Sequence, residues 1–186
     1  RWVDHELRDG LIHGVVGPQG CGKTTLLETV SGLIEPYNGR VLIDGEDAAG
    51  LSPARRNIAH GFRDPVVYDA MTVFDNLAFP LRNQGLGNGD IGPRVEAVAG
   101  LLGLGDYLGQ SARRLDGNAR RKTALGRLLI RRDAAAILLD EPFADMSAEA
   151  RWQFRRDLRL WRGQSAPTLV FATDDAAEAM ALADRV

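Results

Sequence analysis

The sequence predicts an α/β fold in which a parallel sheet is flanked by helices. Two unbroken apolar runs, at 135–139 and 168–172, are typical of strands that are covered on both faces. Segments with helical spacing and helix start signals alternate with such runs, and this alternation favours a parallel sheet. The 186 residues, 45% of them hydrophobic, are enough for one domain with its own core. A single cysteine, Cys21, agrees with a fold that needs no disulfide.

The first expected elements are a strand over 11–16, a glycine-rich turn, and a helix over 23–33 with apolar residues at helical spacing. Residues 83–92 are expected to form a loop, and 91–123 a mostly helical insert between strands. A helix over 147–161 would place Phe154, Leu158 and Trp161 on one core-facing stripe. Helix starts are predicted from four capping signals: Ser52 before Pro53, Thr72 with Asp75, Ser147 before Ala148, and Asp175 with Glu178.

Charge and hydropathy exclude several classes of protein. With 23 basic and 25 acidic side chains the net charge is -2, which argues against binding nucleic acid through bulk electrostatics. No apolar run approaches the roughly 18–20 residues of a membrane span. Among the basic residues only Lys23 and Lys122 are lysines, so the positions of these two call for an explanation.

A phosphate-binding loop is predicted at the end of the first strand. Residues 17–24, Gly-Pro-Gln-Gly-Cys-Gly-Lys-Thr, fit the pattern G-x-x-x-x-G-K-[ST] between a predicted strand and a predicted helix. Lys23 would reach the β- and γ-phosphates of ATP, and the Thr24 hydroxyl would ligate Mg²⁺. The alternatives are a tight turn with a chance lysine and, for Cys21, a redox role in place of a small filler. The predicted ATP-binding residues are Gly17, Pro18, Gln19, Gly20, Cys21, Gly22, Lys23, Thr24 and Thr25.

Two carboxylates end the run Ile137-Leu138-Leu139-Asp140-Glu141. Asp140 at the end of a buried strand can hold Mg²⁺ or its water, and Glu141 can polarise water for attack on a γ-phosphate. The alternative is a pair of solvated charges at a strand end. With the loop upstream, the pair predicts a P-loop NTPase core in which Glu141 is the catalytic base and Thr24 and Asp140 hold the metal.

Five blocks in order resemble the ATP-binding-cassette (ABC) ATPases, specifically the ATP-binding subunits of bacterial carbohydrate and polyol importers of the maltose, glycerol and glycerol-phosphate type. They are GPQGCGKTTLLETVSGL, GRVLIDGEDAAGLSPARRNIAHGF, VYDAMTVFDNLAFPL, ILLDEPFADMSAEAR and TLVFATDDAAEAMALADRV. The resemblance implies a core over 1–62 and 133–186, with a helical subdomain over 63–132 inserted between the Q-loop and the signature. It also implies that the chain is a domain cropped at both ends.

The resemblance further implies partners and a location. Two such domains sandwich ATP head to tail, so the expected partners are a second ABC ATPase subunit, as a homodimer or heterodimer, and transmembrane permease subunits. A periplasmic or extracellular substrate-binding protein would act indirectly, and no nucleic acid is expected. The expected location is the cytoplasmic face of the cell membrane.

Five positions depart from the pattern of the family. Arg63 replaces the Q-loop glutamine, and an arginine cannot accept a hydrogen bond from the attacking water. Asp116 and Asn118 replace a serine and a glycine of the signature, so an anion would face the partner's γ-phosphate. Ser147 replaces the D-loop aspartate, and Asp174 replaces the switch histidine. We therefore expect retained ATP binding with weakened hydrolysis, and pairing with a more complete ATPase.

Three other functions stay open from the sequence. A catalytically inactive pseudo-ATPase would bind nucleotide without hydrolysis, and an ABC ATPase could act without a permease. A small-molecule P-loop kinase explains the loop but not the blocks that follow it. His5, His13 and His60 lie away from the switch position and are interpreted as surface or strand residues.

Overall fold

The computed structural model describes residues 3–163 and 166–186, which form two compact units. Unit 1 comprises Arg1–His60, Asp133–Ala144 and Ser165–Val186, and unit 2 comprises Gly61–Arg132 and Asp145–Gln164. The second unit thus takes up residues 145–164 in addition to the insert. No helix of the described residues is long and apolar enough to cross a membrane.

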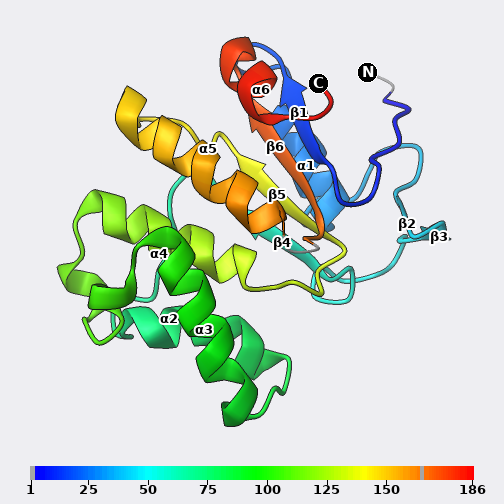
Figure 1. Ribbon diagram of the computed structural model, residues 1–186. Helices are drawn as coiled ribbons and strands as arrows, with labels where there is room; N and C mark the ends of the chain where they lie inside the picture. The colour runs from blue at the N-terminus through cyan, green and yellow to red at the C-terminus, as the bar shows by residue number, and fades with distance from the viewer. Residues whose placement is uncertain (1–2, 164–165) are drawn as a thin grey trace. The chain divides into compact units, whose positions relative to one another are not determined.

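Unit 1 is built on a four-stranded sheet (Figure 1). The strand order is β1 (Ile12–Val16), β6 (Thr168–Thr173), β5 (Ala136–Asp140) and β4 (Ile58–Gly61). β6 runs parallel to both β1 and β5, with Val16 opposite Thr173 and Asp140 opposite Ala172. The carboxyl ends of β1, β6 and β5 therefore meet at one edge. A short hairpin of β2 (Leu42–Ile43) and β3 (Glu46–Asp47) stands apart from this sheet.

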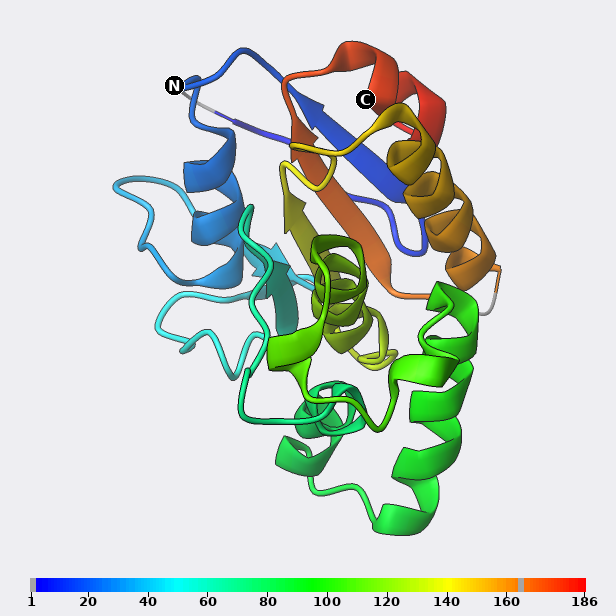
Figure 2. The ribbon, with the colours of Figure 1, turned by 90° about the vertical axis from the view of Figure 1, so that its left-hand side faces the viewer.

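Helices α1 (Lys23–Ser31) and α6 (Ala176–Leu182) lie on opposite faces of the sheet (Figure 2). On the α1 face, Leu27 packs in one buried cluster with Leu138 and Val170. On the other face, Gly14 is so close to α6 that an added Cβ would lie 3.3 Å from the Ala179 methyl. Alternate side chains of β6 thus bury both faces, as its unbroken apolar sequence predicts.

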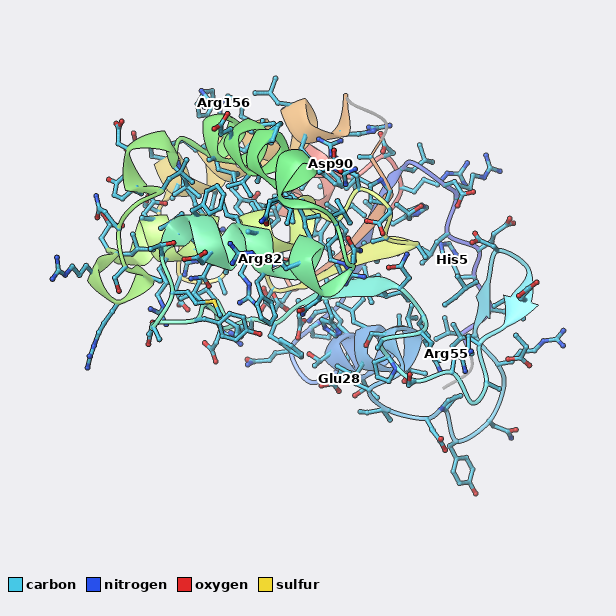
Figure 3. The ribbon with its side chains drawn as sticks, turned by 90° about the horizontal axis from the view of Figure 1, so that it is seen from below. His5, Glu28, Arg55, Arg82, Asp90 and Arg156 are labelled. Atoms are coloured by element: carbon cyan, nitrogen blue, oxygen red, sulfur yellow. The ribbon has the colours of Figure 1, made fainter. Side chains whose placement is uncertain are left out.

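Unit 2 is helical. It contains α2 (Val73–Asn83), α3 (Asn88–Leu102), α4 (Gly117–Leu129) and α5 (Ala148–Arg162), with short 3₁₀ turns at Gly105–Tyr107 and Ala112–Arg114. Figure 3 labels Arg82 in α2 and Arg156 in α5. Phe154, Leu158 and Trp161 are buried, which confirms the predicted stripe on α5.

Three of the four predicted helix starts are confirmed by capping contacts. The side chain of Thr72 accepts from the amide of Asp75, that of Ser147 from Ala150, and that of Asp175 from Ala177 and Glu178.

Three boundaries were predicted wrongly. No helix follows Ser52, because the turn after Pro53 ends at Asn57, whose φ of 52° stops a helix before the chain extends into β4. The helix from Lys23 ends at Ser31 and not at 33, since Gly32 caps it in the left-handed region. The expected loop at 83–92 shrinks to residues 84–87, because the glycine-rich start of α3 is helical even though Pro93 lies inside this helix.

Candidate functional site

The predicted phosphate loop, Asp140, Glu141 and Asp174 meet at the carboxyl edge of the unit 1 sheet. Gly17 directly follows β1, Asp140 ends β5, and Asp174 directly follows β6. The amide of Gly17 donates to the carbonyl of Thr173 at 3.3 Å, and the amide of Glu141 donates to Ala172 at 2.9 Å. Ligands of open α/β sheets bind at this edge.

The loop itself has the backbone of a phosphate cradle. Gly20 and Gly22 adopt φ values of 77° and 105°, which favour glycine. A Cβ on Gly17 would lie 2.6 Å from the sulfur of Cys21, so the side chain of Cys21 leaves room only for glycine at this position. Helix α1 begins at Lys23, so its positive end and its first amides face the loop.

Lys23 lies folded over this loop, with only 7% of its surface exposed. Its Nζ donates to the carbonyls of Gly17 at 2.9 Å and Pro18 at 3.3 Å, and it forms an ion pair with Oε1 of Glu141 at 3.1 Å. The loop lysine and the expected catalytic base are thus direct partners. Nothing in the spacing of the sequence indicates this pair.

Asp140 offers a buried, half-satisfied carboxylate next to the loop. Its Oδ2 accepts from the Thr24 hydroxyl at 2.8 Å, whereas no donor of residues 3–163 and 166–186 reaches the buried Oδ1. A hard cation is the natural partner of such an oxygen, and Mg²⁺ binds through one or two protein oxygens together with phosphates and water. The pair of Thr24 and Asp140 therefore fits a magnesium ion. The described residues hold no cluster of three His, Cys, Asp or Glu side chains, so phosphate and water oxygens would complete the coordination.

Glu141 has a strained backbone, with a φ of 46° in the left-handed region. Two hydrogen bonds hold this conformation. The amide of Glu141 donates to the carbonyl of Ala172, and the carbonyl of Glu141 accepts from the amide of Ala144 at 3.1 Å. Strain of this kind concentrates at functional positions, where the surrounding structure determines the direction of one side chain.

His60, on β4, is a neighbour of the site, although the sequence predicts only a surface or strand residue there. Burial lowers the pKa of His60, and the negative charges of Asp140 and Glu28 oppose this effect. Nδ1 of His60 lies 3.0 Å from the hydroxyl of Ser31, which itself donates to the carbonyl of Glu28. Figure 3 labels Glu28 on α1. The sequence gives no local signal for this position, because it is the pairing of β4 with β5 that brings His60 near Asp140.

The five positions that are expected to depart from the family pattern lie at exposed sites or at helix caps. In unit 1, Asp174 is exposed beyond the end of β6. In unit 2, Asp116 caps α4 by accepting from the amide of Ala119 at 2.8 Å, and Ser147 caps α5. Arg63 and Asn118 are exposed, the latter in the first turn of α4. Of these five positions, Asp174 is the one that belongs to unit 1, where it follows β6 at the edge that carries Asp140.

Comparisons with known proteins bear on the fold and on the family of the chain. The fold resembles that of cbiO1 from Clostridium perfringens, described as part of the ABC transporter complex cbiONQ, with a TM-score of 0.87 at 22% identity over 98% of this chain and 74% of that one. This likeness and the observed sheet confirm the predicted α/β fold class.

Sequence relatives point to the same family. The chain is 41% identical over 184 residues to the sn-glycerol-3-phosphate import ATP-binding protein UgpC of Ralstonia nicotianae, covering 99% of this chain and 50% of the relative. It is 38% identical to the trehalose/maltose import ATP-binding protein MalK of Thermococcus litoralis, covering 100% of this chain and 51% of the relative. The chain thus spans about half the length of these relatives. Residues 1–144 match the ABC transporter family, and the chain therefore belongs to that family.

Proposed function

We propose that this chain is the ATP-binding part of an ABC importer for a sugar, a polyol or a glycerol phosphate. The observation that carries the proposal is the buried Asp140, whose Oδ1 has no donor among the described residues while its Oδ2 accepts from Thr24 of the phosphate loop. The next residue, Glu141, pairs with Lys23 of the same loop. The import functions named for the UgpC and MalK relatives support the direction of transport and the substrate class.

The loop residues would bind the nucleotide and order its phosphates. Amides of residues 17–25 would donate to phosphate oxygens, and Lys23 would exchange its bond with Glu141 for the β- and γ-phosphates. Thr24 and Asp140 would hold Mg²⁺, which when bound neutralises charge on the transferred phosphoryl group. Glu141, released from Lys23, would then accept a proton from the attacking water.

Hydrolysis by this chain would be slow, because the residues expected around the γ-phosphate are altered. Arg63 cannot orient the water by accepting a hydrogen bond from it, and Asp174 adds negative charge where a histidine would donate a hydrogen bond. Asp116 would present a carboxylate to the nucleotide of a partner, and Asn118 and Ser147 remove a glycine and an acid at the same interface. The chain would therefore work with a second, more complete ATPase and with permease subunits at the cytoplasmic face of the membrane.

The test is to measure nucleotide binding and phosphate release on the purified chain with and without Mg²⁺. We expect binding that depends on Mg²⁺ and slow release of phosphate. The triple variant Arg63→Gln, Asp116→Ser, Asp174→His should release phosphate faster, and adding Glu141→Gln should abolish the gain. Brisk hydrolysis by the unaltered chain that Glu141→Gln removes would contradict the impaired site.

The ion pair between Lys23 and Glu141 favours one second candidate, a nucleotide-binding pseudo-ATPase. In that protein Glu141 would only hold Lys23 until nucleotide arrives. It would bind ATP, yet neither the triple variant nor Glu141→Gln would change phosphate release.

A further inference from the structure

In unit 2, two arginines of α4 hold the segment that follows Arg63. The guanidinium of Arg127 donates to the carbonyl of Val66 at 2.6 Å and stacks on the ring of Tyr68, with 4.2 Å from its central carbon to the ring centroid. Two helical turns earlier on α4, Arg120 forms an ion pair with Asp69 at 2.6 Å. Because residues seven apart share one face of a helix, both arginines point to the same segment, residues 66–69.

The same segment is fixed from α2. The buried amide side chain of Asn76 accepts from the amide of Tyr68 at 2.8 Å and donates to the carbonyl of Tyr68 at 3.0 Å. The ring of Tyr68 meets Phe79 edge to face, with 4.8 Å between centroids. Tyr68 is thus held at its backbone by α2 and at its ring between α2 and α4.

The continuation of this segment pairs with the chain that leads into α4. The amide of Ala112 donates to the carbonyl of Met71 at 2.9 Å, the amide of Val73 donates to Gln110 at 2.9 Å, and Thr72 forms an antiparallel bridge with Ser111. Residues 111–115 then run directly into Asp116, the cap of α4. The segment after Arg63 is therefore linked to the segment before Asp116 by backbone hydrogen bonds, and to α4 itself by Arg120 and Arg127.

We infer that Arg127 is a positioning residue that couples residues 66–69 to the start of α4, so that Arg63 and Asp116 shift together. Within residues 3–163 and 166–186, the side chain of Arg127 contacts the first of these segments, and its effect on the second passes through α4 and the paired chain. The coupling belongs to unit 2 and needs no nucleotide. Its importance for turnover rests on the proposed ATPase function.

The test is hydrogen exchange of the amides of Tyr68, Ala119 and Arg120 in the nucleotide-free chain. Arg127→Met should speed exchange about tenfold or more at Tyr68, since a charged hydrogen bond and a ring contact are lost, and should also speed it at Ala119 and Arg120. Arg127→Lys should restore part of the protection. Arg94→Met, at an exposed arginine of α3, should leave all three amides unchanged.

Faster exchange confined to Tyr68, or no change, would overturn the coupling. If Arg127→Met does not fold, Tyr68→Leu and Tyr68→Phe take its place, and only the leucine variant should loosen Ala119 and Arg120. ATP affinity, measured separately, should stay within about twofold in Arg127→Met, because the phosphate loop lies in unit 1. If the unaltered chain does not bind ATP, the proposed function is contradicted, whereas the inference drawn from hydrogen exchange is unaffected.

Discussion

Replacing Asp140 with asparagine should stabilise the nucleotide-free protein and remove its response to magnesium. Asp140 is 7% exposed, and its Oδ2 accepts one hydrogen bond, from Thr24. No donor in the described part of the chain satisfies Oδ1. The fold thus keeps a buried charge with half of its bonding capacity unused, as expected where a site is built for a cation.

The magnitude follows from comparing the two side chains. An unsatisfied buried polar group costs about 1–3 kcal/mol, and more when it is charged. In Asp140→Asn the carbonyl oxygen can still accept from Thr24, and the unsatisfied group becomes a neutral NH₂. Exchanging a charged unsatisfied group for a neutral one should raise the free energy of unfolding by about 1 kcal/mol. For a chain of this size that corresponds to about 2–4 °C in the melting temperature.

The assay is thermal melting of the unaltered chain and of Asp140→Asn, each with ATP alone and with ATP plus Mg²⁺. At a ligand concentration of about 100 Kd, binding to the folded state should stabilise the unaltered chain by about 2.7 kcal/mol. The variant should melt higher without ligand and should show no added effect of Mg²⁺.

Asp157 provides the matched control. It is a buried acid of unit 2, and burial raises its pKa although Lys122 and Arg156 oppose this shift. Asp157→Asn should keep the full magnesium effect. An Asp140→Asn protein that melts lower without ligand, or that still responds to Mg²⁺ as the unaltered chain does, would refute the reasoning.

Two further predictions concern stability. Burial lowers the pKa of His60 from its ordinary value of 6.5, so as the pH falls the imidazole takes up a proton in the unfolded chain before it does so in the folded chain. The neutral, partly buried His60 therefore contributes its full stability above pH 6.5, and this stability is lost on acidification. Between about pH 7.5 and 5.5, the free energy of unfolding, measured by urea titration, should therefore fall less in His60→Asn than in the unaltered chain. One proton accounts for at most about 1.4 kcal/mol per pH unit. A steeper fall in His60→Asn than in the unaltered chain would contradict this prediction. Gly126→Ala should destabilise the fold by about 1–2 kcal/mol, since the added Cβ would lie 2.6 Å from a methyl group of Leu77. As a control, Gly100→Ala on α3, where an added Cβ has nothing within 4 Å, should be neutral or stabilising. Equal effects of the two substitutions in the same titration would argue against tight packing of α4 on α2.

Much of unit 1 could be predicted because its signals are local. The apolar runs ending at Asp140 and Thr173 and the spacing from Gly17 to Thr24 each depend on a few adjacent residues. Parallel pairing then brings their carboxyl ends together without further information. The polar caps at Thr72, Ser147 and Asp175 were predictable for the same reason.

The remaining features depend on contacts between distant residues. The pairing of Lys23 with Glu141 joins positions 118 residues apart, and the left-handed backbone of Glu141 has no sequence signal in a non-glycine residue. The glycines of 87–92 predict a loop by their local composition. The segment is helical instead because the packing that stabilises α3 comes from Val95, Val98 and Leu102 further along the chain. The hold of Arg127 on residues 66–69 likewise emerges only from the fold.

The most direct test of the account is calorimetric titration of the purified chain with a non-hydrolysable ATP analogue and Mg²⁺. We predict saturable binding of one nucleotide per chain, which Lys23→Met weakens at least about tenfold through loss of the charged contacts to phosphate. Lys122→Met, at the other lysine, should bind as the unaltered chain does. Undiminished binding in Lys23→Met, or no binding by the unaltered chain, would contradict the assignment of residues 17–25 as the nucleotide site.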